Sequence, residues 1–166
     1  MFNANDSPQW LALLGKQVEL AFSKEAPNGY LLGWDSNRYF SDFTRLVQPH
    51  ACRNQTTFDY QFCTTFALGL RQNSSELCLT LLMSFIAPVA SIHWTEKKPN
   101  WKHPRVVPPP VFAAAMEQDK NIQKWLTGLG FGLLTSTQED TPVRVTTLEL
   151  CEGQATIGRC LFYDFA

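Results

Sequence analysis

The residues best suited to chemistry in this chain are a histidine and a cysteine two positions apart. His50 and Cys52 occur in the segment Pro49-His50-Ala51-Cys52, and side chains two apart on an extended chain share one face. A neighbouring base converts a thiol into the nucleophilic thiolate, so the pair indicates a cysteine-based enzyme site. The orienting group and oxyanion hole that such a site also requires have no signature in the sequence. We therefore expect Cys52 to be structural, and keep a small enzyme using Cys52 and His50 as an alternative.

Other catalytic and cofactor motifs are missing from the sequence. The three histidines, His50, His93 and His103, form no HExxH motif, and the five cysteines show no CxxC or zinc-finger spacing. No GxGxxG, GxSxG or phosphate-loop motif occurs, and the glycine cluster at 128–132 follows a predicted helix instead of preceding one. We predict no catalytic residue, no metal site and no cofactor.

The segment from Trp94 to Arg105 is the best candidate for binding a partner. Tryptophan and arginine are residue types in which interface energy concentrates, and lysines surround them here. The predicted partner-binding residues of this segment are Trp94, Lys98, Trp101, Lys102, His103 and Arg105. We predict Trp101 as the anchor and the basic residues as a steering rim. Two alternatives stay open: Trp94 ends a buried strand, and Trp101 pins the segment to the core.

An acidic pair is the second candidate contact. Glu139 and Asp140 occur in the polar stretch 137–142, which has the composition of a turn. Carboxylates in such a turn are normally solvated, so we assign them no catalytic role. Glu139 and Asp140 complete the set of predicted partner-binding residues.

The elements that must position these residues begin with three strand-like stretches. Apolar and polar residues alternate over 58–67 and again over 77–85, with a turn predicted at 71–75, and a third stretch covers 89–95. Short connections between neighbouring strands predict an antiparallel meander. The residues expected in its core are Phe62, Leu79 and Leu81.

Two helical stretches flank this meander. Ser7 is a predicted N-cap with Pro8 at the first helical position, and apolar residues then recur at helical spacing as far as Lys24. A second stretch, 112–129, predicts one helix or two. Residues 39–47 fit either a strand or a short helix. The remaining predicted strands are 30–34, 131–135, 143–150 and 155–165.

Residues 96–110 are predicted as a Pro-rich basic connector. Proline fixes φ and lacks the N–H that a strand or helix uses, so we expect no regular secondary structure over this segment. The same rigidity lowers the ordering entropy that opposes binding, which favours a role in partner contact.

Length and composition predict a single α+β domain over 1–166. The chain has 166 residues, of which 45% are hydrophobic and 17% charged, enough to form one core without metal or disulfide support. Because each helical stretch has one apolar stripe and each strand one apolar face, we expect the helices to pack on one face of an antiparallel or mixed sheet.

Charge and hydropathy restrict the partners and the location. A formal charge of −1 provides no basic field for nucleic acid, and the apolar run 77–90 is shorter than the roughly 20 residues of a membrane-spanning helix. The start Met1–Asp6 lacks the pattern of a signal peptide. An odd number of cysteines without paired spacing predicts reduced thiols. We expect a cytoplasmic protein that binds neither nucleic acid nor membrane.

The order of these features resembles a known class of proteins. The amphipathic N-terminal helix, the meander around 84–94 and a last strand closing on 161–164 resemble small cytosolic immunity proteins encoded beside bacterial polymorphic toxins. The resemblance implies a non-enzymatic inhibitor that binds a cognate toxin and occludes its active site or blocks its assembly. A strongly acidic chain would suit a nuclease-directed inhibitor, and this chain is not acidic. A small-ligand-binding domain is a further alternative, and the oligomeric state is left open.

Overall fold

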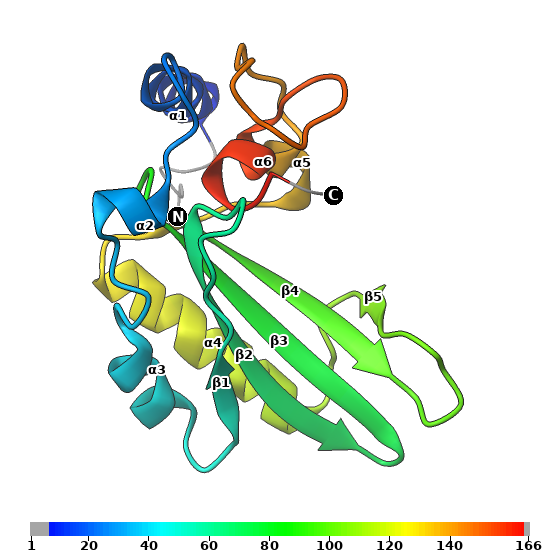
Figure 1. Cartoon of the computed structure of the whole chain (residues 1–166). Coiled ribbons are helices and arrows are strands. Elements are labelled where there is room, and N and C mark those ends of the chain that lie inside the picture. Colours follow the sequence, from blue (N-terminus) through cyan, green and yellow to red (C-terminus); the bar gives the residue numbers. More distant parts are fainter. Residues whose placement is uncertain (1–6, 165–166) are drawn as a thin grey trace.

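The structure is a computed structural model that describes residues 7–164 (Figure 1). The helices are α1 (Pro8–Ala21), α2 (Gly29–Leu32), α3 (Phe40–Val47), α4 (Ala113–Gly128), α5 (Ser136–Glu139) and α6 (Ile157–Leu161). The strands are β1 (Cys52–Asn54), β2 (Cys63–Gln72), β3 (Ser75–Ser84), β4 (Val89–Lys97), β5 (Arg105–Val107) and β6 (Gly132–Leu133). The predicted lack of a signal segment at 1–6 and the end of the predicted strand 155–165 lie outside the described residues.

The predicted meander is confirmed as the centre of a mixed sheet. Strands β1 to β5 lie side by side in sequence order, each antiparallel to the next, and β6 adds a parallel pair to β4. Together with the helices, this sheet confirms the α+β class. The edges are short, because β1 and β5 have three residues each and β6 has two.

The first long strand differs in its limits from the prediction. Strand β2 begins at Cys63 instead of residue 58, and it continues to Gln72, where the β2–β3 turn contains only Asn73 and Ser74. Asn73 has φ 56°, a left-handed conformation that asparagine tolerates better than most residues. The predicted turn at 71–75 was therefore too long, since its outer residues belong to the strands.

The prediction of an irregular connector over 96–110 is wrong in part. Strand β4 extends to Lys97, and β5 pairs with it through Trp94↔Val107 and Glu96↔Arg105. Pro99 and Pro104 lie in the loop of this β4–β5 hairpin, and the three consecutive prolines follow β5. The proline-free residues 105–107 are thus able to form a short edge strand.

The predicted terminal helix begins as its sequence signal indicates. Ser7 caps α1, accepting a hydrogen bond from the Trp10 backbone N–H at 3.1 Å, with Pro8 in the first turn. The predicted stretch 112–129 forms one helix, α4, over residues 113–128, and residues 40–47 form the helix α3.

Three predicted strands are absent from the described residues. Asn28 caps a helical turn, α2, by accepting from the Leu31 N–H at 3.1 Å, so 30–34 is not a strand. Residues 143–150 are irregular. Thr156 accepts from the Arg159 N–H at 3.3 Å and caps α6, so most of 155–165 is helical or irregular instead of extended.

Two groups of buried side chains hold these elements together. The first group, the sheet core, lies between the strands and helices α3 and α4, which cover one face (Figure 1). Its fully buried members include Phe43, Phe66, Leu79, Leu81, Ile122 and Leu126. Helix α4 therefore covers a sheet face as predicted.

The second group lies at one end of the sheet. There α1 and α6 pack through Val18, Phe22 and Leu161 against Phe62 and Leu82, so α1 does not share the face covered by α4. Leu82 belongs to the opposite face of β3 from Leu81, because side chains alternate along a strand. The three residues predicted as core, Phe62, Leu79 and Leu81, are buried.

Leu79→Ala is expected to lower the free energy of unfolding by about 2–5 kcal/mol, because it leaves a cavity in the sheet core. Urea denaturation followed by tryptophan fluorescence measures the loss. Thr80→Ala, at the next position of β3 and on the opposite face, is the matched control and should lose clearly less. Equal losses at the two positions would contradict the one-sided burial of β3.

Candidate partner-binding site

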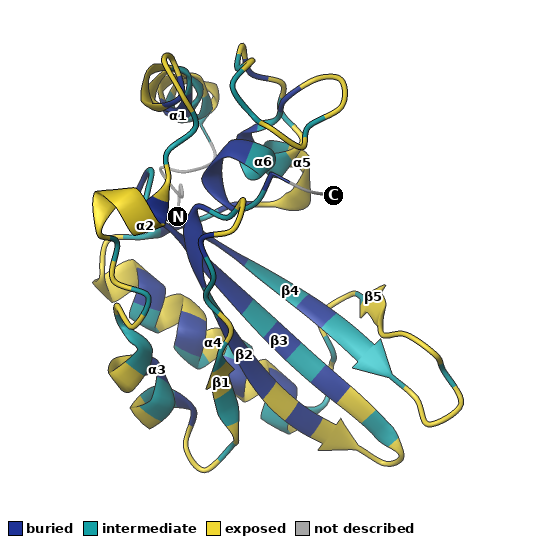
Figure 2. Cartoon of the chain, in the orientation of Figure 1, coloured by how far each residue is buried: buried dark blue, intermediate teal, exposed yellow. Residues whose placement is uncertain are grey.

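One face of the sheet carries no helix over most of its length (Figure 1). Over residues 68–71 of β2 and 76–81 of β3, buried residues alternate with exposed and half-buried ones, as Figure 2 shows. The side chains on the uncovered side are small or polar. They include Thr65 and Gly69 from β2, Cys78 and Thr80 from β3, and His93 and Thr95 from β4. We call this surface the open face.

The open face contains a shallow hollow of about 550 Å³. Arg53, Arg71 and Lys97 line it, and Pro104 reaches its rim from the β4–β5 loop. No atom lies within 4 Å of the position that a Cβ of Gly69 would take, so the floor of the hollow is uncovered there. The hollow therefore reaches the hairpin only at Pro104. Arg105 belongs to the other side of the sheet, because it pairs with Glu96, and Glu96 pairs with the buried Leu77.

Charge in this hollow is mainly positive. Glu76 pairs with Arg71 at 3.2 Å between side-chain oxygen and nitrogen, and it lies directly opposite Lys97 in the β3–β4 register. Arg53 brings a second guanidinium from β1. One carboxylate thus faces three cations, which gives this end of the open face a basic character.

The hairpin loop brings three of the predicted partner-binding residues into direct contact. The Arg105 guanidinium carbon lies 4.1 Å from the centre of the Trp101 ring, and Lys98 Nζ lies 5.2 Å from it. Such cation–π contacts hold an aromatic ring in place. The Trp101 backbone N–H donates to the Lys98 carbonyl at 3.0 Å, which tightens the loop. Lys102 and His103 lie in the same loop and are exposed.

The structure removes Trp94 from the candidate surface. Its side chain is 2% exposed and belongs to the sheet core, on the face covered by α4. This position matches the alternative interpretation, in which Trp94 belongs to a buried strand. Trp94 lies opposite Leu79 in the register, and that pairing places both on the inner face.

The acidic pair lies apart from the hairpin. Glu139 ends α5, which sits over the opposite end of the sheet, and its Oε1 is 3.7 Å from His93 Nε2. Asp140 is exposed beside it. The eight predicted residues therefore form three groups: the hairpin loop, the buried Trp94, and the α5 carboxylates.

Glu139 belongs to a half-buried polar cluster that the sequence did not indicate. Ser91 and His93 share one side of β4, with Ser91 Oγ 2.9 Å from His93 Nε2. Burial raises the pKa of the Glu139 carboxyl, and the neighbouring Ser91 hydroxyl and His93 offset part of this effect. The spacing Ser91-x-His93 on a strand is a signal that these two side chains meet, but nothing local links them to Glu139.

The cluster contains the residue types of a hydrolytic triad without its geometry. In such a triad the serine and the carboxylate contact opposite ring nitrogens of the histidine. Here both Ser91 and Glu139 approach the same nitrogen, Nε2 of His93. The carboxylate therefore cannot orient the imidazole toward the hydroxyl, and the arrangement is that of a structural polar cluster.

The cysteine alternative finds no support in the geometry. The Cys52 thiol donates to Thr44 Oγ1 at 3.5 Å, and Cys52 lies opposite Leu68 on the helix-covered face of β1. His50 donates its backbone N–H to the Val47 carbonyl at 3.0 Å. No hydrogen bond between His50 and Cys52 exists in the described part of the chain. All five cysteines are free thiols.

Two further observations bear on possible ligands. Within residues 7–164, no group of three or more histidine, cysteine or acidic side chains is arranged to hold a metal ion. No helix in that range combines the length and apolar character needed to cross a membrane.

Glu139→Gln is expected to stabilise the fold at neutral and higher pH. The folded-state pKa of Glu139 lies above its ordinary value of 4.5, so its stabilising contribution exists below that value and is lost as the pH rises through the folded pKa. The gain from glutamine should therefore disappear as the pH falls below 4.5. Thermal unfolding of both proteins across this range measures it. Glu117→Gln, at an exposed position of α4, is the control. A gain from Glu139→Gln that does not change with pH would refute the prediction.

Comparison with known proteins adds no relative. No protein-family model matches the chain, and neither a curated protein nor a solved structure is significantly similar to it.

Proposed function

We propose that this chain is a non-enzymatic, protein-binding inhibitor: an immunity protein that neutralises a cognate toxin in the cytoplasm. The observation that carries the proposal is the β4–β5 hairpin, where the side chains of Lys98 and Arg105 both contact the ring of Trp101. An inhibitor needs a stable scaffold and one complementary surface with an aromatic anchor and a charged rim.

The hairpin suits this role because its anchor is already ordered. The contacts with two cations restrict the Trp101 ring before a partner arrives, so binding costs less entropy. Pro99 and Pro104 restrict the backbone of the loop in the same way. Trp101 is half-buried, which leaves part of the ring available for contact.

The positive charge of the hollow and the hairpin indicates what kind of partner surface would bind. Arg53, Arg71 and Lys97 line the hollow, and Lys98 and Arg105 flank the anchor. The chain as a whole has a formal charge of −1, so this basic region is local. We infer a partner protein with an acidic contact surface, whose approach the basic rim accelerates at low salt.

Co-expression with the toxic domain encoded by a neighbouring gene tests the proposal. Growth should recover when the chain is present, and the two proteins should purify as a complex of fixed stoichiometry. An inhibitor of this kind loses its effect when the toxin is in molar excess, whereas an enzyme would keep protecting at substoichiometric amounts. Protection at a small fraction of the toxin concentration would reverse the assignment.

Trp101→Ala is expected to weaken binding to that partner by at least about 2 kcal/mol, because it removes the anchor. Isothermal titration calorimetry measures the change, and Trp101→Phe, which keeps a ring, should lose less. If Trp101→Ala instead lowers the melting temperature while the folded protein binds normally, the ring is a structural pin.

Lys98→Glu is expected to slow association at low salt and to have little effect at high salt, because rim charges act on the encounter and are screened. Stopped-flow association rates measure this. Lys124→Glu makes the same charge change on an exposed position near the end of α4, which leads into β6 at the start of β4 and away from the hairpin, and should leave the rate almost unchanged. Equal slowing by both variants would show that overall charge, and not the hairpin, steers the encounter.

A further inference from the structure

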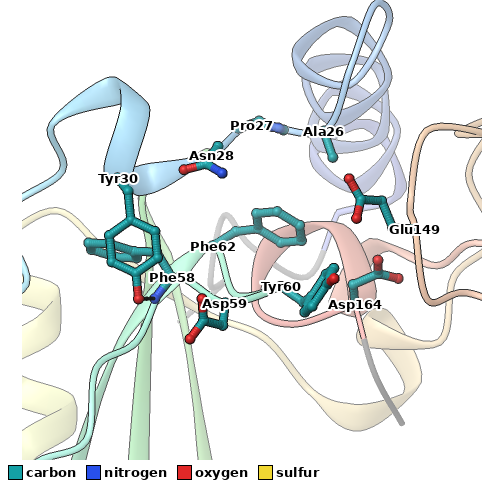
Figure 3. A pocket seen from close by; sticks show the side chains of 10 residues that line it. All are labelled: Ala26, Pro27, Asn28, Tyr30, Phe58, Asp59, Tyr60, Phe62, Glu149 and Asp164. Atoms are coloured by element: carbon teal, nitrogen blue, oxygen red, sulfur yellow. Dashed lines mark hydrogen bonds between the residues drawn. The ribbon is translucent and has the colours of Figure 1, made fainter.

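A cavity of about 210 Å³ lies at the end of the sheet farthest from the tip of the β4–β5 hairpin. Three segments distant in sequence surround it: the α1–α2 connection, the chain leading into β2, and the C-terminal residues (Figure 3). Its lining contains three carboxylates, those of Asp59, Glu149 and Asp164, and no lysine, arginine or histidine. The cavity is therefore an acidic site with no cation of its own.

Of these three carboxylates, that of Asp164 is buried and has one oxygen without a hydrogen-bond partner. The residue is 1% exposed, its backbone N–H donates to the Tyr60 carbonyl at 2.9 Å, and its Oδ2 accepts from the Leu150 N–H at 2.8 Å. Its Oδ1 has no hydrogen-bond partner. A buried carboxylate oxygen without a donor is costly, and a positively charged donor would satisfy it.

The side chains that lie beside Asp164 in the cavity are exposed at its surface. Glu149 and Tyr60 lie next to it in the cavity (Figure 3), and both are exposed. Rotation of either exposed side chain would open a path from solvent to Oδ1 of Asp164. Glu149 then supplies a second carboxylate for the same cation.

Aromatic rings form the rest of the lining. Tyr30, Phe58, Tyr60 and Phe62 contribute them. The Tyr30 and Phe58 rings meet edge to face with centroids 5.5 Å apart, and the Phe58 backbone N–H donates to the Tyr30 hydroxyl at 3.2 Å. Ring faces attract organic cations, and several rings beside carboxylates recognise ammonium and guanidinium groups.

Tyr60 is held in an unfavourable backbone conformation. Its φ is 58°, in the left-handed region that glycine and asparagine adopt more easily than tyrosine. Strain of this kind concentrates at functional sites, where the side chain is needed at that position. A glycine here would relieve the strain and lose only the ring.

We infer that this cavity binds an organic cation, an ammonium or guanidinium group at the end of an alkyl chain. Such a group donates to Asp164 and Glu149 while its flat or methylene surface contacts the Tyr60 ring. A free amine and a lysine or arginine side chain of a polypeptide present the same chemistry. The inference concerns a site remote from the hairpin and does not depend on the proposed inhibitor function.

Titration with butylguanidinium, followed by ¹H–¹⁵N NMR at low salt, tests the inference. We expect saturable shifts at the amides of Tyr60, Leu150 and Asp164, and none with butylurea, which has a similar shape without the charge. A capped hexapeptide with one central arginine provides the second arm. Binding of the peptide at least about tenfold more tightly than butylguanidinium identifies a polypeptide as the source, and similar or weaker binding identifies a free amine. Absence of saturable shifts with both cations overturns the inference.

Three variants locate the site. Asp164→Asn keeps an oxygen for the Leu150 N–H, Glu149→Gln changes an exposed residue, and Tyr60→Gly removes the ring while relieving φ. Each should weaken cation binding by about tenfold, with the folded spectrum retained. Glu117→Gln, on the exposed side of α4, is the matched control and should bind as the original chain does. Unchanged binding in Glu149→Gln and Tyr60→Gly would place the cation elsewhere and overturn the inference.

Discussion

Phe66, Leu79 and Leu81 point to the same side of the β2–β3–β4 meander, where α3 and α4 cover them, and this one-sided burial determines the rest of the structure. Because the apolar residues of each strand are used on that side, the other side receives small and polar residues such as Thr80 and Thr95. A sheet face of that kind needs no covering helix to be stable in water. The open face and the hairpin beside it are therefore products of how the core is packed.

How far the sequence predicts this structure depends on the length of each pattern. The alternation over 77–85 extends for enough residues to identify β3 and its inner face, and the Ser7-Pro8 signal identifies the start of α1. Residues 143–150 and 155–165 carry only short apolar runs, which strand, helix and irregular chain share. In the stretch 155–165 the helix α6 begins at its N-cap, Thr156. Threonine is also common in strands, so this residue did not distinguish a helix from a strand.

The candidate sites likewise differ in how far they could be predicted, because some join sequence neighbours and others join residues distant in sequence. Trp101, Lys98 and Arg105 meet because a short hairpin closes around them, so sequence proximity was a sufficient guide. The Glu139–His93 contact joins residues from α5 and β4, and the acidic cavity joins Tyr60 with Asp164. Contacts at that separation depend on how α5, α6 and the last residues fold back over the sheet. No local periodicity or spacing encodes that arrangement, so the cavity could not be predicted from the sequence.

The short edges of the sheet determine how this protein can meet other polypeptides. Strand β5 exposes only three residues of backbone and is followed at once by three prolines, which have no N–H to offer to an incoming strand. The outer strand β1, on the other edge, is equally short. Another chain therefore has little backbone with which to extend the sheet. Recognition must therefore use side chains of the open face and of the β4–β5 loop. The same short edges hinder molecules of this protein from pairing edge to edge into fibres at high concentration.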